Sequence, residues 1–343
     1  MAVPATLEAW REFVDRSPTK PEMLTARQVR ALSDGAREQY DRDRLRWLSA
    51  DIVLETPDVR NLRRLWTMLS AESLTDAATL SRALAISGSP TFGKSTGVMW
   101  IAKHHERQQR QRHPLIPPAE LQPSVYVVTP PATTPKMLMI AFCNTLGLPH
   151  TRSQTAQDLA EQVVHVLRTL RTSLVVLDEI HNVHSNRQVG AESASSLKLF
   201  AERLDAAFLF AGIDLPRSAV FSGPAGEQLA GRTMSYTMVG YSSRSVLDRT
   251  EWGTLISTLN DMLPLRDQAA GALQPAAGFL FDVTGGSIGR LRSLLRRTAI
   301  DAIRTGHEWI DKNDLQRVAT VTGIVADAAS PPATNPRLEA DSA

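Results

Sequence analysis

The sequence predicts an α/β protein in which a parallel sheet of five strands lies between layers of helices. Between about residues 80 and 240, short apolar runs of strand length alternate with amphipathic stretches. Buried strands that alternate with helices are typical of a parallel sheet that is covered on both faces. A glycine-rich turn directly after the first apolar run is the second indication, because it has the strand-to-helix context of a phosphate-binding loop.

The first 70 residues are expected to form a helical N-terminal extension. They are polar, and Leu32, Leu45 and Ile52 recur at roughly helical spacing among many charges. Pro57 can begin a further helix, whose apolar residues would lie on one side.

Residues 71–243 are expected to hold the sheet and its helices. The candidate strands are five apolar runs at residues 83–87, 125–129, 174–178, 207–212 and 236–240. After these runs the strand pattern stops, and we expect residues 244–326 to form a small helical lid. Residues 327–343 are rich in Pro, Ala, Asp and Ser, a composition that predicts disorder.

The overall composition is that of an ordinary soluble globular protein. Apolar residues make up 43% of the 343 residues and charged residues 22%, and the formal net charge is only +2. A strongly basic body is therefore excluded, although a local basic patch is not. Cys143 is the single cysteine, which fits a reducing compartment. No signal peptide or membrane-spanning run is recognisable, so we expect a cytoplasmic protein.

A phosphate-binding loop is predicted at residues 88–95, where GSPTFGKS fits the pattern G-x4-GK[ST]. Its glycines let the backbone wrap closely around phosphate oxygens, and backbone amides point toward the anion. Lys94 would reach the β- and γ-phosphates of ATP, and Ser95 would ligate Mg²⁺. The alternative is a glycine-rich turn in which the lysine occurs by chance. The residues expected to bind the nucleotide in this segment are Gly88, Ser89, Pro90, Thr91, Phe92, Gly93, Lys94, Ser95 and Thr96.

An acidic pair, Asp178 and Glu179, ends the third apolar run. A buried strand would carry Asp178 to the carboxyl edge of the sheet, where ligands of such sheets bind. There Asp178 can hold Mg²⁺, directly or through water, and Glu179 can activate the attacking water. A turn that caps a helix is the alternative interpretation.

Two histidines, His181 and His184, follow the acidic pair. Their spacing of three could place both on one helix face, as in zinc sites, but no third ligand with suitable spacing is evident. We prefer a histidine near the nucleotide or on the surface.

Five longer strings extend these motifs, at residues 44–69, 124–149, 174–183, 207–213 and 285–303. The proline-rich TPPATTP, DEIHN and SIGRL are the more particular parts of them. Together the strings resemble TniB and TnsC, the AAA+ ATPases that regulate DNA transposition. Over about residues 40 to 325, the resemblance implies a P-loop αβα sandwich with a C-terminal helical lid. It also implies an ATP-dependent homo-oligomer, a ring or a filament, that binds double-stranded DNA and recruits or activates a transposase or integrase.

The resemblance also implies roles for single arginines. Arg232, in GEQLAGRTMSY, resembles the arginine finger that stabilises the γ-phosphate bound by a neighbouring subunit. It would act with Lys94 and Glu179 in catalysis. Arg290, in GGSIGRLRSL, matches the lid arginine that contacts the nucleotide, and Arg292 is a near alternative. Solvent-exposed arginines without such roles are the simpler interpretation.

The fourth apolar run departs from the family pattern. That strand usually ends in a polar residue that senses the γ-phosphate, whereas Ile213 takes this place here, with Asp214 beside it. Slow or altered ATP hydrolysis would be one consequence.

A basic run ends the helix that is expected after the phosphate-binding loop. It contains Lys103, Arg107, Arg110 and Arg112, which could follow a DNA backbone in a salt-dependent manner. The alternative is a solvated helix end, where basic residues suit the negative end of the helix dipole. No base-reading motif is recognisable, so we expect DNA binding to be sequence-neutral.

Other functions compete with a transposition regulator. A replication initiator or helicase loader is the first alternative, and a nucleotide switch without useful hydrolysis is the second. A small-molecule kinase could use the same loop, but the acidic pair and the long N-terminal region fit it poorly.

Overall fold

The structure is a computed structural model that describes residues 4–72, 83–183 and 187–324. These residues fall into two compact units. The first, which we call the sheet unit, comprises the described residues up to Arg16 and those between Val53 and Met238. The second, the helical unit, comprises Ser17–Ile52 and the described residues from Val239 onward.

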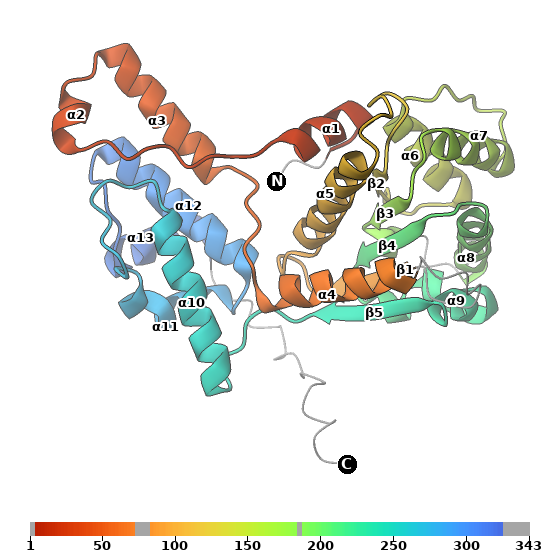
Figure 1. Ribbon diagram of the computed structural model, residues 1–343. Helices are drawn as coiled ribbons and strands as arrows, with labels where there is room; N and C mark the ends of the chain where they lie inside the picture. The colour runs from red at the N-terminus through yellow and green to blue at the C-terminus, as the bar shows by residue number, and fades with distance from the viewer. Residues whose placement is uncertain (1–3, 73–82, 184–186, 325–343) are drawn as a thin grey trace. The chain divides into compact units, whose positions relative to one another are not determined.

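A sheet of five parallel strands forms the centre of the sheet unit (Figure 1). The strand order is β2-β3-β4-β1-β5, so β4 lies between β1 and β3. This confirms the predicted fold class. The strands are β1 (Ala83–Gly88), β2 (Ser124–Val128), β3 (Leu174–Asp178), β4 (Ala207–Gly212) and β5 (Thr233–Met238).

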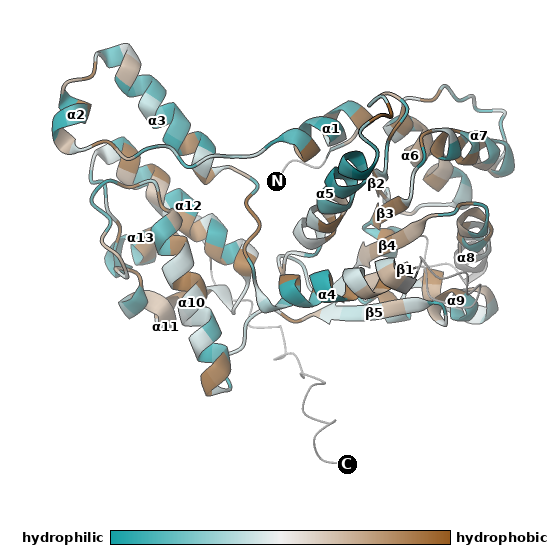
Figure 2. Cartoon of the chain, in the orientation of Figure 1, coloured by the Kyte–Doolittle hydropathy of each residue, from teal (hydrophilic) through white to brown (hydrophobic). Residues whose placement is uncertain are grey.

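Alternating side chains of the strands build one core on each face of the sheet. Ala85 and Val127 pack in one core with α6 (Pro135–Leu146), α7 (Ala156–Thr169), α8 (Arg187–Glu202) and α9 (Gly223–Ala230). Leu84 and Ile86 face the other core, with α1 (Leu7–Asp15), α4 (Pro57–Glu72) and α5 (Lys94–Arg112). In Figure 2 the central strands β3 and β4 carry apolar colour, whereas β5 is pale. Both faces are covered, as the near-continuous apolar runs predict.

The fifth strand begins earlier than the sequence predicts. The prediction placed it at residues 236–240, whereas β5 spans Thr233–Met238. β5 pairs only with β1 and is an edge strand, so several of its side chains are polar or exposed. An apolar run marks a buried strand but misses the polar start of an edge strand.

The helical unit joins an N-terminal segment to the C-terminal helices. Trp47 Nε1 donates to Met262 O at 2.7 Å, and the buried Arg44 guanidinium lies 2.6 Å from a Glu308 carboxylate oxygen. These contacts tie together segments that are more than 200 residues apart. The helices of this unit are α2 (Ala26–Arg30), α3 (Asp34–Leu48), α10 (Val246–Met262), α11 (Ala277–Thr284), α12 (Ile288–Thr305) and α13 (Lys312–Thr322).

This division differs from the predicted N-terminal extension over residues 1–70. α1 and α4 pack within the sheet unit, whereas α2 and α3 belong to the helical unit. The sequence pattern identifies helices but does not show which partner each helix packs on. The tail predicted to be disordered lies outside the described residues. Within the described ranges, no helix has the length and apolar composition that crossing a membrane requires.

Candidate nucleotide-binding site

The turn between β1 and α5 requires glycine at its start. The φ angles of Gly88, Thr91 and Gly93 are all positive, at 152°, 68° and 94°. A Cβ on Gly88 would lie 2.8 Å from Met238 O of the neighbouring strand β5, so no larger residue fits without a shift. The turn leads into the first turn of α5, whose amides lack helical partners and attract anions.

Lys94 lies inside this loop. Its side chain is buried, and Nζ donates to Ser89 O at 3.0 Å. Burial lowers the pKa of Lys94, whereas the negative charges of Glu179 and Asp178 oppose that decrease. The ammonium group is therefore within electrostatic reach of both the loop and the acidic pair.

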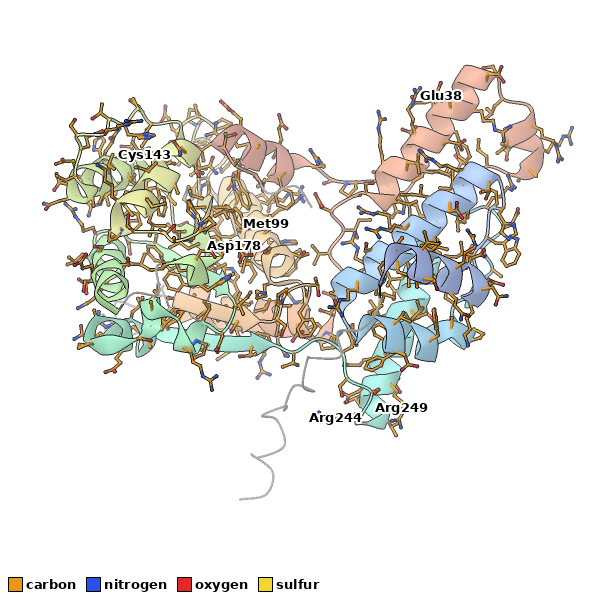
Figure 3. The ribbon with its side chains drawn as sticks, turned by 180° about the vertical axis from the view of Figure 1, so that it is seen from behind. Glu38, Met99, Cys143, Asp178, Arg244 and Arg249 are labelled. Carbon is orange, nitrogen blue, oxygen red and sulfur yellow. The ribbon has the colours of Figure 1, made fainter. Side chains whose placement is uncertain are left out.

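Asp178 and Ser95 are both hydrogen-bonded to the hydroxyl of Tyr126. Asp178 ends β3 in the interior of the sheet unit (Figure 3), and the Tyr126 hydroxyl donates to its Oδ2. The Ser95 side chain is hydrogen-bonded to the same phenol. Burial, and next the charge of Asp178, raise the pKa of Tyr126, so the phenol keeps its proton and donates it. The structure thus brings together a hydroxyl and a carboxylate, which are oxygen ligands of the kind that Mg²⁺ prefers.

These residues fit a magnesium nucleotide. Mg²⁺ usually keeps several waters and takes phosphate oxygens beside one or two protein oxygens. Among the described residues, no three His, Cys, Asp or Glu side chains are grouped as a metal site. Ser95 and Asp178 would hold the metal, and Lys94 and the loop amides would bind the phosphates. The alternative of zinc between His181 and His184 is not tested, because His184 lies outside the described residues.

Glu179 follows Asp178 in a tight turn. Its φ is 55°, and its backbone N donates to Asp178 Oδ1 at 2.8 Å. Its side chain is 39% exposed, so the carboxylate can contact water, as a group that activates water must.

The ring of His181, in the turn that follows β3, contacts the end of β4. Ile213 follows β4 and exposes its side chain. Its backbone N donates to Nδ1 of His181 at 3.3 Å, and the same Nδ1 lies 3.4 Å from Glu179 Oε2. A polar ring, that of His181, thus lies beside the strand end at which Ile213 has no polar side chain.

Sequence reasoning missed Tyr126 as a site residue and left His181 open. The register pairs Tyr126 with Val176, so Tyr126 is diagonal to Asp178 on one face of adjacent strands. The alternation of VYVVT was the available signal, but it becomes informative only once β2 is known to lie beside β3.

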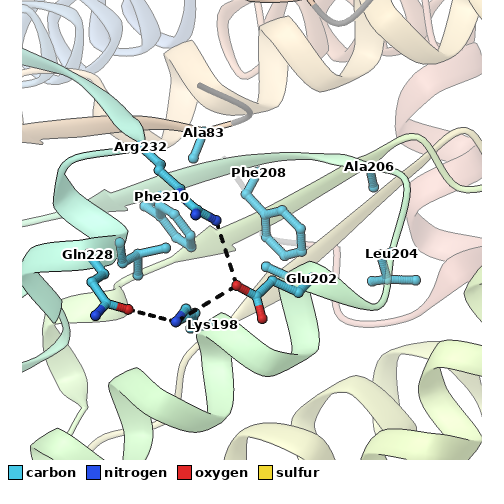
Figure 4. A pocket seen from close by; sticks show the side chains of 11 residues that line it. Ala83, Lys198, Glu202, Leu204, Ala206, Phe208, Phe210, Gln228 and Arg232 are labelled. Atoms are coloured by element: carbon cyan, nitrogen blue, oxygen red, sulfur yellow. Dashed lines mark hydrogen bonds and ion pairs between the residues drawn. The ribbon is translucent and has the colours of Figure 1, made fainter. Parts of the chain in front are cut away.

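Arg232 lies at the amino ends of the strands, which we call the amino edge, whereas the phosphate-binding loop lies at their carboxyl ends. It directly precedes β5, whose register pairs Thr233 with Ala83 and Met238 with Gly88. About 16 Å of strand therefore separates Arg232 from the loop of its own subunit. Its side chain is 64% exposed and lies 3.6 Å from Glu202, above a pocket of about 160 Å³ (Figure 4). Such a side chain is free to contact another molecule but not its own loop.

The two candidate lid arginines both lie on α12. Arg292 donates to Ala50 O and Ile52 O, both at 3.0 Å, and its burial lowers its pKa. Arg292 therefore holds the helical unit together, and Arg290 stays the predicted nucleotide contact.

Three of the four residues on α5 that are predicted to contact DNA bind the end of α1 in this structure. Lys103, Arg107 and Arg110 converge there, whereas Arg112 is exposed. Their partners are the carbonyl oxygens of Phe13, Val14 and Arg16 and the carboxylate of Asp15, at 2.6–3.3 Å. Cations at a helix C-terminus complement its dipole. The sequence could not show this, because α1 lies about 90 residues earlier.

The strand order, the phosphate-binding loop and the acidic pair define the fold of an AAA+ ATPase. Three solved structures share this fold. The ORC2 protein of Aeropyrum pernix, in ADPNP–ADP complexes, has a TM-score of 0.59 and 18% identity over 80% of this chain and 71% of that chain. Cdc6p of Pyrobaculum aerophilum has a TM-score of 0.56 and 15% identity over 81% of this chain and 70% of that chain. The Aeropyrum pernix ORC1 protein in complex with DNA has a TM-score of 0.59 and 16% identity over 81% of this chain and 69% of that chain.

The chain belongs to the TniB family. Residues 44–241, more than half of the chain, match the family described as bacterial TniB protein. The predicted family resemblance is therefore confirmed. No curated protein matches this chain.

Proposed function

We propose that this chain is an ATP-dependent regulator of DNA transposition. It binds ATP with Mg²⁺ at the carboxyl edge of the sheet, assembles as a homo-oligomer on double-stranded DNA, and recruits or activates a transposase. The observation that carries the proposal is the convergence of Lys94, Ser95 and Asp178 beside the phosphate-binding loop. Membership of the TniB family supports the link to transposition.

ATP acts between subunits in this proposal. Arg232 is exposed and is separated from its own loop by the length of β5, so it serves the nucleotide of a second copy. A guanidinium that reaches the γ-phosphate makes the bound nucleotide part of the contact between copies. Arg290 contributes from the helical unit as the lid arginine.

Hydrolysis ends the assembled state. Glu179 accepts a proton from the attacking water, and the exposure of its carboxylate supports this role. ATP binding alone would favour assembly, and loss of the γ-phosphate would favour release.

DNA binding is sequence-neutral and depends on charge. Arg112 is the exposed member of the predicted basic run and contacts a phosphate in the assembled form. Lys103, Arg107 and Arg110 support this surface by fixing α1, so their contribution to DNA binding is indirect.

Two substitutions test the proposal on duplex DNA with ATP, with assembly followed by light scattering and electron microscopy. Lys94→Ala removes the buried ammonium group and is expected to abolish assembly. Glu179→Gln keeps nucleotide binding but removes the proton acceptor, so it is expected to trap the assembled form. Lys136→Ala, at a half-buried lysine that donates to Arg152 O outside the proposed site, is the control and should behave as wild type. The proposal is wrong if wild type stays monomeric with ATP and DNA.

A replication initiator or helicase loader is the second candidate. The ORC and Cdc6 proteins share the fold over about four-fifths of this chain, which favours this candidate. Pull-downs with a purified transposase and with a purified replicative helicase of the same organism separate the two. ATP-dependent capture of the transposase supports the regulator, and capture of a replicative helicase alone supports the initiator.

A further inference from the structure

His181 joins two strands at the carboxyl edge of the sheet. It lies in the short 3-10 turn Ile180–Asn182 that follows β3, and its ring is 24% exposed. Nδ1 lies 3.4 Å from Glu179 Oε2 and 3.3 Å from the backbone N of Ile213, which follows β4. One ring atom therefore contacts both the expected proton acceptor and the end of the adjacent strand.

The end of β4 leaves room for this ring. A Cβ on Gly212 would lie 3.1 Å from His181 Nδ1 and 3.3 Å from its backbone N. Glycine at 212 thus permits the close approach of the imidazole to the strand.

The two contacts of Nδ1 are chemically distinct. A ring with its proton on Nε2 accepts a hydrogen bond at Nδ1 from the amide of Ile213. A ring with a proton on Nδ1 donates to the carboxylate of Glu179 instead. Nδ1 can therefore make only one of these hydrogen bonds at a time, and the position of the ring proton decides whether it binds Glu179 or the end of β4.

We propose that His181 is a positioning residue for Glu179, which it binds when the ring proton is on Nδ1 and releases when Nδ1 accepts from the backbone N of Ile213 at the end of β4. The inference rests on the proposed function, because it assigns Glu179 the role of proton acceptor. His181 holds the carboxylate while water approaches, and it makes the placement of that carboxylate sensitive to movement of β4. It takes no proton from the attacking water itself.

Substitutions that keep or remove the Nδ1 atom test this role. His181→Asn places an amide oxygen or nitrogen near the position of Nδ1, whereas His181→Gln places its amide near Nε2, and His181→Ala removes both. We expect kcat for ATP hydrolysis to fall about tenfold in His181→Ala and His181→Gln, the size typical of lost supporting contacts, and to recover largely in His181→Asn. The Kd for ATP and the melting temperature should stay unchanged in all three.

A second readout does not need hydrolysis. Nitrogen chemical shifts of the His181 ring, measured by NMR on the nucleotide-free chain, should move when Glu179→Gln removes the carboxylate, and Lys136→Ala should leave them unchanged. Unmoved shifts, or a kcat in His181→Ala equal to wild type, would overturn the inference. If wild type binds ATP but hydrolyses none, the hydrolytic part of the proposed function fails, and the NMR result still decides whether His181 contacts Glu179.

Discussion

The carboxyl and amino ends of the strands differ: unusual backbone conformations gather at the first, and exposed ion pairs lie at the second. Each of the first four strands is followed at the carboxyl edge by a non-glycine residue with positive φ: Thr91, Ala132, Glu179 and Asp214. Among the described residues of the sheet unit, the one such residue elsewhere is Arg171, which precedes β3. Each of these conformations is unfavourable by about 1–3 kcal/mol and tends to persist at functional sites.

The amino edge has long side chains in exposed ion pairs instead. Arg232 and Lys198 share Glu202, at 3.6 and 3.8 Å. Exposed pairs of this kind contribute about 0–1 kcal/mol and exchange partners easily. Under the proposed function, the carboxyl edge holds the nucleotide, and the exposed Arg232 at the amino edge serves the nucleotide of a second copy. Two copies would complete each other.

The largest expected effect comes from the amino edge. Arg232→Ala should lower kcat for ATP hydrolysis about 1000-fold, because an arginine finger stabilises transition-state charge. The Kd for ATP should change little, since the loop lies about 16 Å away along the strand. Phosphate release and fluorescent-nucleotide titration measure the two quantities. Arg203→Ala removes another exposed, carboxylate-paired arginine as a control, and an equal loss there would contradict the role of Arg232.

Substitution of Gly88, the first glycine of the phosphate-binding loop, tests the carboxyl edge. Gly88→Ala should weaken ATP binding up to about 100-fold, because the added Cβ meets Met238 O at 2.8 Å and φ is 152°. Gly147 also has positive φ, but nothing lies within 4 Å of its added Cβ. Gly147→Ala should therefore cost about 1 kcal/mol of stability and leave ATP affinity intact. Equal ATP affinities of Gly88→Ala and Gly147→Ala in calorimetric titration would contradict a specific role of Gly88 in nucleotide binding.

The amino edge should also show a pH dependence. His105 is buried against Ser173, just before β3, with Nε2 2.8 Å from Oγ. Burial lowers the pKa of His105 from 6.5 to about 4, so between these values the unfolded chain binds a proton that the folded chain does not. The free energy of unfolding should fall by about 3 kcal/mol as the pH decreases from 6.5 to 4.

Urea unfolding at several pH values measures this decrease, and two variants assign it. His105→Phe should lose this part of the decrease, whereas His104→Phe, at the exposed neighbour, should retain it. Equal pH dependence in wild type and His105→Phe would show that other groups cause it.

The smallest effect concerns the anchor of α1. Lys103→Ala removes two hydrogen bonds, to Phe13 O at 2.8 Å and Arg16 O at 2.6 Å, and should reduce the free energy of unfolding by about 1–2 kcal/mol. Arg112→Ala should leave stability unchanged and instead lower the salt dependence of DNA binding. The reverse pattern would return Lys103 to the role of a direct DNA contact.

The sequence predicts features that one segment encodes alone. Four strands were placed within one residue at either end, because buried parallel strands are nearly continuous apolar runs. The phosphate-binding loop was predicted because its glycines and Lys94 act within one turn. Tyr126, His181 and the anchor of α1 depend on which strands and helices become neighbours. No local pattern carries that information, so sequence analysis could not assign them.

The central claim is that a site is completed between two copies, and mixed variants test it most directly. Lys94→Ala keeps Arg232 but cannot bind ATP, and Arg232→Ala binds ATP but lacks the finger. With ATP and duplex DNA, an equimolar mixture should hydrolyse ATP at least about tenfold faster than either variant alone, because mixed contacts restore one complete site. A rate equal to the mean of the two separate variants would contradict the account.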